Sequence, residues 1–228
     1  MLSAGLDYKR SRSGQSLPVP QAKTIMITLY HAPQSRSSRI VWLLEEIGVP
    51  YTIRPVSIFR RMTGEGEPDS TNPHPDRRVP ALIHGDTLVT ESLAIVLYLA
   101  DAFPQARLAP AITDPRRGAY LTWMAWYASE MEPALFAGLM GELASSPQKR
   151  RGHEAVVGRL ETALADGPYV MGEAFTGADL LIASALGFGR QAFPASRLLD
   201  AYVDRCKDRP AAQRGVALDG ASGPQGLR

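Results

Sequence analysis

Three serines, Ser35, Ser37 and Ser38, stand close together where a helix is expected to begin. Pro33 and the polar residues after it favour a turn, and apolar residues then recur at helical spacing to residue 47. The first turn of a helix has free N–H groups and a positive electrostatic potential. A hydroxyl there can donate a hydrogen bond to a negatively charged group, or it can only cap the helix. Both roles can coexist at neighbouring serines.

A second polar pair, Glu91 and Ser92, begins another predicted helix at residues 91–103. Ser92 and the free N–H groups of the first turn are suited to a carboxylate, and Glu91 is suited to an ammonium group. The alternative is an ordinary N-terminal cap with an acidic residue in the first turn. The residues alone do not separate these two interpretations.

The elements that position these residues follow an α/β order in the first half of the chain. Short strands are predicted at residues 25–30, 51–56, 81–84 and 87–90. The first helix lies between the first two strands, so we expect a right-handed crossover with parallel pairing. Gly85-Asp86 predicts a hairpin between the last two strands. The long connection at residues 57–78 is of the kind that usually carries function.

After Pro104 the chain shows helical patterns and no convincing strand. The helices are predicted at residues 114–140, 150–165, 176–186 and 197–207. Thr176 and Asp179 have the spacing of a capping box. We therefore expect an α/β domain at residues 25–104 and an all-α domain at residues 113–214. A disordered tail at residues 1–24 and a flexible tail at residues 215–228 are expected to flank them.

The composition excludes several classes of protein. The 228 residues are 45% hydrophobic and 21% charged, as in ordinary soluble proteins. No apolar run reaches the roughly 18 residues of a membrane span, so no membrane partner is expected. The net charge is +2, but residues 1–24 alone carry +3, and the rest of the chain sums to −1. This tail-borne charge gives no reason to expect nucleic-acid binding.

Cysteine and histidine are used sparingly. Cys206 is the single cysteine, which excludes an intrachain disulfide, a multi-cysteine zinc site and a CxxC redox centre. A reducing cytoplasm is then the natural compartment. The four histidines show no metal-ligand spacing, so no metal is expected; they are His31, His74, His84 and His153.

Taken in order, four motifs resemble those of the cytosolic glutathione transferases, and in particular the bacterial, theta-like members of serine type. They are LYHAPQSRSSR with WLLEEIGVPY at residues 29–51, RVPAL at 78–82, TESLAIVLYL at 90–99 and FTGAD at 175–179. No single motif is decisive, but all four occur in the family's order. The resemblance implies an α/β thioredoxin-like N-terminal domain and an all-α C-terminal helical bundle, which together form the glutathione transferase fold.

The resemblance also implies the chemistry. Glutathione is the co-substrate, and its thiolate, the more nucleophilic form of the thiol, adds to small electrophilic molecules. Ser35, five residues after Tyr30, has the spacing of the serine whose hydroxyl stabilises the thiolate, and Ser37 is the second candidate. Tyr30 ends the first strand and is read as structural.

Further residues are implied to hold glutathione. A cis peptide bond at Pro80 would present the backbone of Val79 to the cysteinyl part, and Glu91 and Ser92 would bind the γ-glutamyl part. Arg77 or Arg78 would contact the glycyl carboxylate, which an arginine can do with two hydrogen bonds. The loop NPHPDRRVP at residues 72–80 is longer than the usual family form. The choice between the two arginines, and a solvated loop as the alternative, therefore stay open.

Trp123, Tyr127 and Met131 lie on the first long helix of the second domain, where the family lines its electrophile pocket. Methionine adapts to varied apolar ligands. The alternative is that this stripe, which also includes Trp126, belongs to the core.

The implied function is that of a cytoplasmic, homodimeric detoxification enzyme, a glutathione S-transferase. One alternative is a glutathione-binding protein without catalysis or with a regulatory role. Another is a glutathione-dependent peroxidase or dehalogenase. A disulfide-exchange enzyme is disfavoured because residues 30–40 contain no cysteine.

Overall fold

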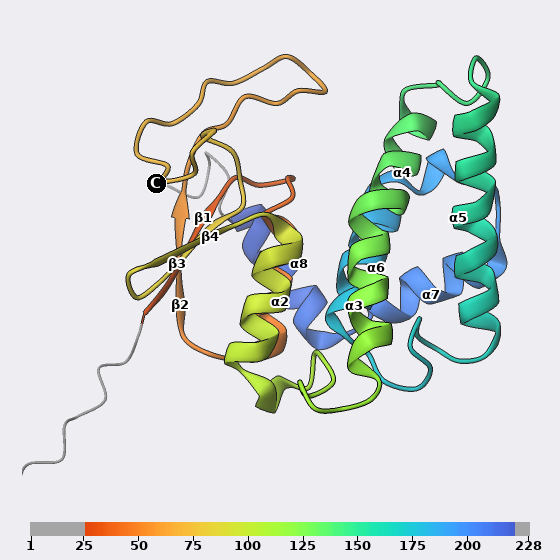
Figure 1. Ribbon diagram of the computed structural model, residues 1–228. Helices are drawn as coiled ribbons and strands as arrows, with labels where there is room; N and C mark the ends of the chain where they lie inside the picture. The colour runs from red at the N-terminus through yellow and green to blue at the C-terminus, as the bar shows by residue number, and fades with distance from the viewer. Residues whose placement is uncertain (1–25, 222–228) are drawn as a thin grey trace, which may run out of the picture.

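The computed structural model describes residues 26–221; the predicted tail at residues 1–24 lies outside this range, as do residues 222–228. Figure 1 shows two domains side by side, a small sheet with helices against it and a larger group of helices. The α/β and all-α order predicted from the sequence is confirmed.

The four predicted strands form one sheet. They are β1 (Ile27–His31), β2 (Tyr51–Pro55), β3 (Ala81–His84) and β4 (Thr87–Thr90), in the order β2-β1-β3-β4. β1 and β2 are parallel, as predicted, and β3 is antiparallel to both of its neighbours. The predicted hairpin turns at Gly85, whose φ of 62° lies in the region that glycine tolerates.

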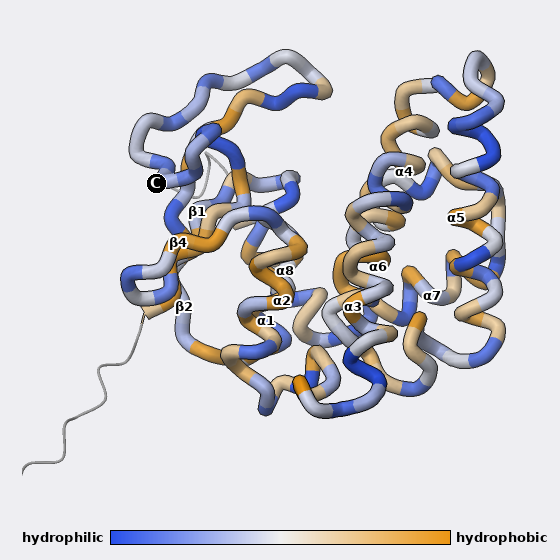
Figure 2. Tube along the Cα trace, viewed as in Figure 1, coloured by the Kyte–Doolittle hydropathy of each residue, from blue (hydrophilic) through white to orange (hydrophobic). Residues whose placement is uncertain are grey.

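Helices α1 (Ser38–Ile47) and α2 (Ser92–Ala102) lie between the sheet and the second domain (Figure 1). Hydrophobic residues run along both helices (Figure 2), and Leu43 and Leu99 are fully buried. α1 ends where predicted, because Gly48 adopts a left-handed conformation and its N–H bonds to the Leu44 carbonyl.

The connection from β2 to β3 crosses the other face of the sheet without a helix. Its residues contribute one isolated bridge, between Arg60 and Glu65, and Figure 2 shows a mainly hydrophilic loop. Beneath it a small apolar cluster is formed by Tyr30, Ala32, Val56, Val79 and Ala81. The loop is thus tied to the sheet near the ends of β1 and β2.

The second domain contains six α-helices among the described residues. They are α3 (Arg117–Trp126), α4 (Glu132–Leu139), α5 (Pro147–Ala165), α6 (Gly177–Gly189), α7 (Arg197–Lys207) and α8 (Pro210–Ala221). Two short 3₁₀ turns are also present, at Pro104–Ala106 and Arg190–Ala192.

The helix predicted over residues 114–140 is interrupted by a π-helical turn, η2 (Tyr127–Met131), between α3 and α4. Pro133 gives a physical reason. Proline has no N–H to continue an α-helix, and its ring clashes with the carbonyl four residues earlier. A wider turn before Pro133 relieves that clash, and such turns recur at functional sites.

α6 runs through the middle of the core and begins at the predicted capping box. Both of its hydrogen bonds are present, between the Thr176 side chain and the backbone of Asp179 and between the Asp179 carboxylate and the backbone of Thr176. Asp179 is fully buried and also accepts from the Val170 N–H at 2.9 Å and the Tyr202 hydroxyl at 3.1 Å.

The second domain extends further toward the C-terminus than expected, because α8 continues past residue 214. The helix continues to Ala221, beyond residue 214, where a flexible tail had been expected to begin. It lies against α1 at close range: a Cβ on Gly215 would come within 3.0 Å of the Trp42 Cα. Glycine at this position therefore permits the two helices to approach.

Within residues 26–221, no helix combines the length and the apolar character needed to cross a membrane.

Candidate active site

The turn between β1 and α1 holds the predicted serines in one hydrogen-bond cluster. Ser35 Oγ lies 2.8 Å from Ser37 Oγ and donates to the Ala32 carbonyl at 2.7 Å, and it accepts the Ser37 N–H at 3.1 Å. Ser35 is partly exposed, whereas Ser37 is fully buried. Of these two serines, Ser35 has the hydroxyl that a ligand can reach.

Ser37 is occupied by interactions inside the protein. Its Oγ lies 2.8 Å from Nδ1 of His31 and accepts the Ala32 N–H at 3.2 Å. The His31 side chain is completely buried. Burial lowers the pKa of His31 despite the opposing effect of the nearby Asp219 carboxylate. Sequence reasoning noted His31 only as lacking metal-ligand spacing and so missed its contact with the serines.

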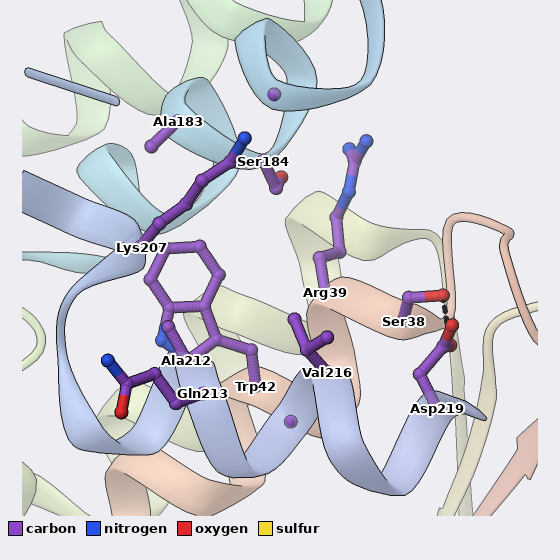
Figure 3. Close-up of a pocket in the computed structure, with 12 residues that line it drawn as sticks. Ser38, Arg39, Trp42, Ala183, Ser184, Lys207, Ala212, Gln213, Val216 and Asp219 are labelled. Carbon is purple, nitrogen blue, oxygen red and sulfur yellow. Dashed lines mark hydrogen bonds between the residues drawn. The ribbon is translucent and has the colours of Figure 1, made fainter. Parts of the chain in front are cut away.

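Asp219, near the end of α8, reaches the same turn from the far end of the chain. Its Oδ2 accepts the Gln34 N–H at 3.1 Å, and its Oδ1 accepts a short hydrogen bond from Ser38, drawn in Figure 3. The same Oδ1 lies 3.3 Å from His31 Nε2. Residue 219 falls in the segment expected to be a flexible tail, so this contact was not predicted. Pro210, which favours the first turn of a helix, was the available signal for α8.

The predicted cis peptide bond joins Val79 to Pro80. The loop before it is held by Asn72, whose side-chain N–H₂ donates to the Arg78 carbonyl at 2.9 Å. Arg77 turns back to donate a short hydrogen bond to the Asn72 carbonyl, whereas Arg78 is half-exposed and pairs with Asp76 at 2.9 Å. Neither arginine is fixed toward a site, so the choice between them stays a prediction.

Glu91 lies between β4 and α2, and Ser92 is the first residue of α2. Glu91 has φ 65° and ψ 126°, a strained conformation of the kind that costs about 1–3 kcal/mol and clusters at functional sites. The Ser92 Oγ is buried and has no hydrogen-bond partner among the described residues. A buried hydroxyl of this kind calls for an explanation, and a bound anionic group would supply one.

The register of the sheet brings these segments together. Tyr30 is paired with Ala81, and Ala81 is paired in turn with Thr90. The serine turn after β1, the cis Pro80 before β3 and Glu91 after β4 therefore lie at the same end of the sheet. The residues predicted separately from three motifs share one edge of the domain.

A charged cluster joins this edge to the second domain. Glu132 Oε1 accepts from the Arg39 guanidinium at 3.1 Å and from the Tyr127 hydroxyl at 2.5 Å, and its Oε2 lies 3.1 Å from Arg36. Burial would raise the pKa of Glu132, but Arg39, Tyr127 and Arg36 together hold the pKa of this carboxyl below its usual value. The cluster ties α1 to the π-helical turn.

The predicted electrophile-binding residues lie mainly inside the protein. Met131 is fully buried, and Tyr127 is 2% exposed with its hydroxyl engaged by Glu132. Trp123 is partly buried, and the Arg159 guanidinium lies 4.6 Å from its ring centre. This burial favours the alternative that the stripe is core, while its role in binding remains a prediction.

A pocket of about 430 Å³ lies between α1, α6, α7 and α8 (Figure 3). Trp42 and Val216 form apolar walls, and the Lys207 side chain crosses its upper side. Ser38 also lines the pocket and accepts the Ser35 N–H at 3.2 Å. The pocket therefore borders the serine turn.

The described residues also bear on a metal site and on a cysteine nucleophile. Among the described residues, no group of three or more His, Cys, Asp or Glu side chains could hold a metal ion. Cys206 is fully buried, and burial raises the pKa of its thiol to about 12, so it is not a nucleophile.

Comparisons with known proteins show the family of the chain. Residues 26–101 match the family described as Glutathione S-transferase, N-terminal domain, and residues 127–210 match Glutathione S-transferase, C-terminal domain. The chain therefore belongs to the glutathione S-transferase family.

The matches to individual relatives cover almost the whole length of those relatives. Glutathione S-transferase GstA of Escherichia coli O157:H7 is 26% identical over 201 residues, which cover 84% of this chain and 98% of the relative. A glutathione transferase structure from Methylococcus capsulatus str. Bath has a TM-score of 0.72 at 26% identity, covering 85% of this chain and 98% of that one. A sphingomonad glutathione S-transferase complexed with glutathione has a TM-score of 0.68 at 26% identity, with the same coverage.

Proposed function

We propose that this protein joins the sulfur of glutathione to small electrophilic molecules, with the Ser35 hydroxyl stabilising the thiolate. The observation that carries the proposal is the placement of Ser35. Its hydroxyl is partly exposed beside α1, at the end of the sheet that also bears the cis Val79–Pro80 bond and Ser92. A hydroxyl donor near a helix N-terminus favours the ionised sulfur.

Ser35 is preferred to Ser37 as the residue that contacts the sulfur. Ser37 is fully buried and bonded to His31 and Ala32, so it supports Ser35 rather than replacing it.

The rest of glutathione is proposed to follow the same edge of the sheet. The γ-glutamyl carboxylate would bind the Ser92 hydroxyl and the free N–H groups of α2, with Glu91 accepting from the ammonium group. The Val79 backbone would pair with the cysteinyl residue. Arg78, half-exposed and paired only with an exposed carboxylate, is preferred to Arg77 for the glycyl carboxylate.

We assign the electrophile to the pocket beside the serine turn. Its walls at Trp42 and Val216 are apolar, and Ser38 connects it to Ser35. Trp123, Tyr127 and Met131 are kept as candidates of lower rank because two of them are buried. We further propose a homodimer with a cytoplasmic detoxification role, as the family resemblance implies.

The test is turnover of a chlorinated nitrobenzene with glutathione by the full chain. We expect conjugation by the wild type and a loss of about 100-fold or more in kcat/KM for Ser35→Ala, the size expected when an electrostatic donor is removed. Ser145→Ala, an exposed serine of the second domain, is the matched control and should keep full activity. Glutathione binding without turnover of several electrophiles would instead favour a regulatory role, and absence of both would overturn the proposal.

A further inference from the structure

The serine turn is connected to a histidine and a carboxylate that the proposed chemistry does not yet use. Ser35 Oγ, Ser37 Oγ and His31 Nδ1 form a continuous line with successive distances of 2.8 Å and 2.8 Å. Asp219 Oδ1 lies 3.3 Å from Nε2 on the far side of the ring. This hydrogen-bonded chain connects the partly exposed Ser35 hydroxyl to the fully buried His31 ring.

His31 Nε2 is buried without a hydrogen-bond partner among the described residues. The Asp219 carboxylate is close to it but is not aligned for a hydrogen bond. The Asp219 carboxylate stabilises the His31 ring most when the ring is positively charged, because attraction between opposite charges at this distance needs no exact alignment. In the neutral tautomer with the proton on Nε2, facing Asp219, Nδ1 is free to accept from Ser37.

We propose that His31, supported by Asp219, receives the proton of the glutathione thiol through Ser35 and Ser37. This inference rests on the proposed function, because it requires the sulfur to lie beside Ser35. Neither His31 nor Asp219 touches the sulfur, so both are positioning residues.

In this transfer the thiol proton stays within the protein and is not released to solvent. The thiol S–H donates its proton to Ser35 Oγ. The Ser35 and Ser37 hydroxyls, which can both donate to the Ala32 carbonyl, turn so that Ser35 passes its own proton to Ser37 Oγ and Ser37 passes its own to His31 Nδ1. One S–H bond breaks and one N–H bond forms, giving a thiolate and an imidazolium next to the Asp219 carboxylate. Every hydroxyl in the line then points toward the sulfur, so Ser35 donates to the thiolate. Burial lowers the pKa of His31, so the ring is neutral before glutathione binds, and the Asp219 carboxylate is the group that stabilises the imidazolium against this burial.

The decisive measurement is the number of protons released when glutathione binds near neutral pH, where the free thiol is mostly protonated. It is obtained by calorimetry in buffers of different ionisation heat, with thiolate formation followed by ultraviolet absorbance. The wild type is expected to form thiolate without releasing a matching proton.

Two variants separate proton acceptance from support of the fold. The amide of His31→Asn can still bond to Ser37 but cannot take the proton. Asp219→Asn removes the charge and keeps one of the two oxygens that accept from Gln34 and Ser38. Each should either release one proton per thiolate formed or lose the thiolate, with kcat/KM reduced about tenfold, the ratio that one pKa unit gives. Asp200→Asn, an exposed carboxylate paired with Arg190, should behave as the wild type.

Three outcomes overturn the relay in distinguishable ways. Release of one proton per thiolate by the wild type rejects the relay and leaves the transferase proposal standing. Binding of glutathione as an un-ionised thiol rejects both the relay and the role of Ser35. Absence of glutathione binding rejects the proposed function itself. Proton release by the wild type tests the relay even if His31→Asn fails to fold.

Discussion

At the scale of single residues, Ser92 offers a clean separation between binding and stability. Its buried Oγ has no hydrogen-bond partner within the described chain, and binding of the γ-glutamyl carboxylate, as proposed, would supply one. In Ser92→Ala we expect glutathione to bind roughly 10- to 100-fold more weakly, since a hydrogen bond to a charged group contributes about 1.5–3 kcal/mol. The free energy of unfolding should not fall.

Ser146 is the matched control for this prediction. It caps α5 by accepting the Lys149 N–H, so Ser146→Ala should lose about 1 kcal/mol of stability and leave glutathione binding unchanged. Isothermal calorimetry and urea unfolding measure the two quantities. If Ser92→Ala binds glutathione as the wild type does, the γ-glutamyl site is elsewhere.

Glu132 also contributes to the pH dependence of stability. Because its pKa is lowered in the folded protein, its contribution is present above the unfolded value of about 4.3 and is lost as pH falls through the folded value. Glu132→Gln leaves the buried Arg39 unpaired and should cost roughly 2–4 kcal/mol at neutral pH, an effect that shrinks in acid.

Unfolding in denaturant at several pH values checks this expectation. Glu142, which pairs with Lys149 at the surface, is the control, and Glu142→Gln should change stability by less than about 1 kcal/mol. A cost for Glu132→Gln that stays the same into strong acid would contradict the proposed ionisation.

At the scale of elements, the contact of α8 with α1 places Asp219 beside the turn that holds the serines. Gly215→Ala would place a methyl group 3.0 Å from the Trp42 Cα, so we expect a loss of about 1–3 kcal/mol from overpacking. A small displacement of α8 should also reduce activity. The same change at Gly158 in α5 has open space around it and should stabilise the protein by about 0.5–1 kcal/mol.

Thermal unfolding and the conjugation assay measure both effects. Stabilisation by Gly215→Ala equal to that by Gly158→Ala would show that the two helices are not in close contact.

At the scale of the whole molecule, one continuous hydrophobic core spans both domains. It includes Leu43 and Leu99 from the first domain and Leu180 and Leu186 from the second. We therefore expect the domains to unfold in one cooperative transition. Circular dichroism and tryptophan fluorescence should give coincident curves, since Trp42 reports on α1 and Trp123 on α3. Separate midpoints for the two signals would contradict a shared core.

The sequence allowed the elements with strong internal patterns to be predicted. The four strands, α1, α2 and α7 follow local alternation, periodicity and turn residues. α8 was missed because its position depends on Gly215 meeting Trp42, a contact that local sequence does not record.

The same distinction holds for the candidate site. Ser35, Pro80 and Ser92 lie in motifs, so they could be proposed from the chain alone. His31 and Asp219 are far apart in sequence and meet only through the packing of α8, so their link to the serines required the structure.

Ser35 is proposed to bind the glutathione sulfur, and a crystal structure of the full chain with glutathione would show which hydroxyl does so. We predict that the sulfur lies within hydrogen-bond distance of Ser35 Oγ, with the γ-glutamyl carboxylate at Ser92. A sulfur that contacts Ser37, Tyr30 or no hydroxyl at all would rule out this role of Ser35.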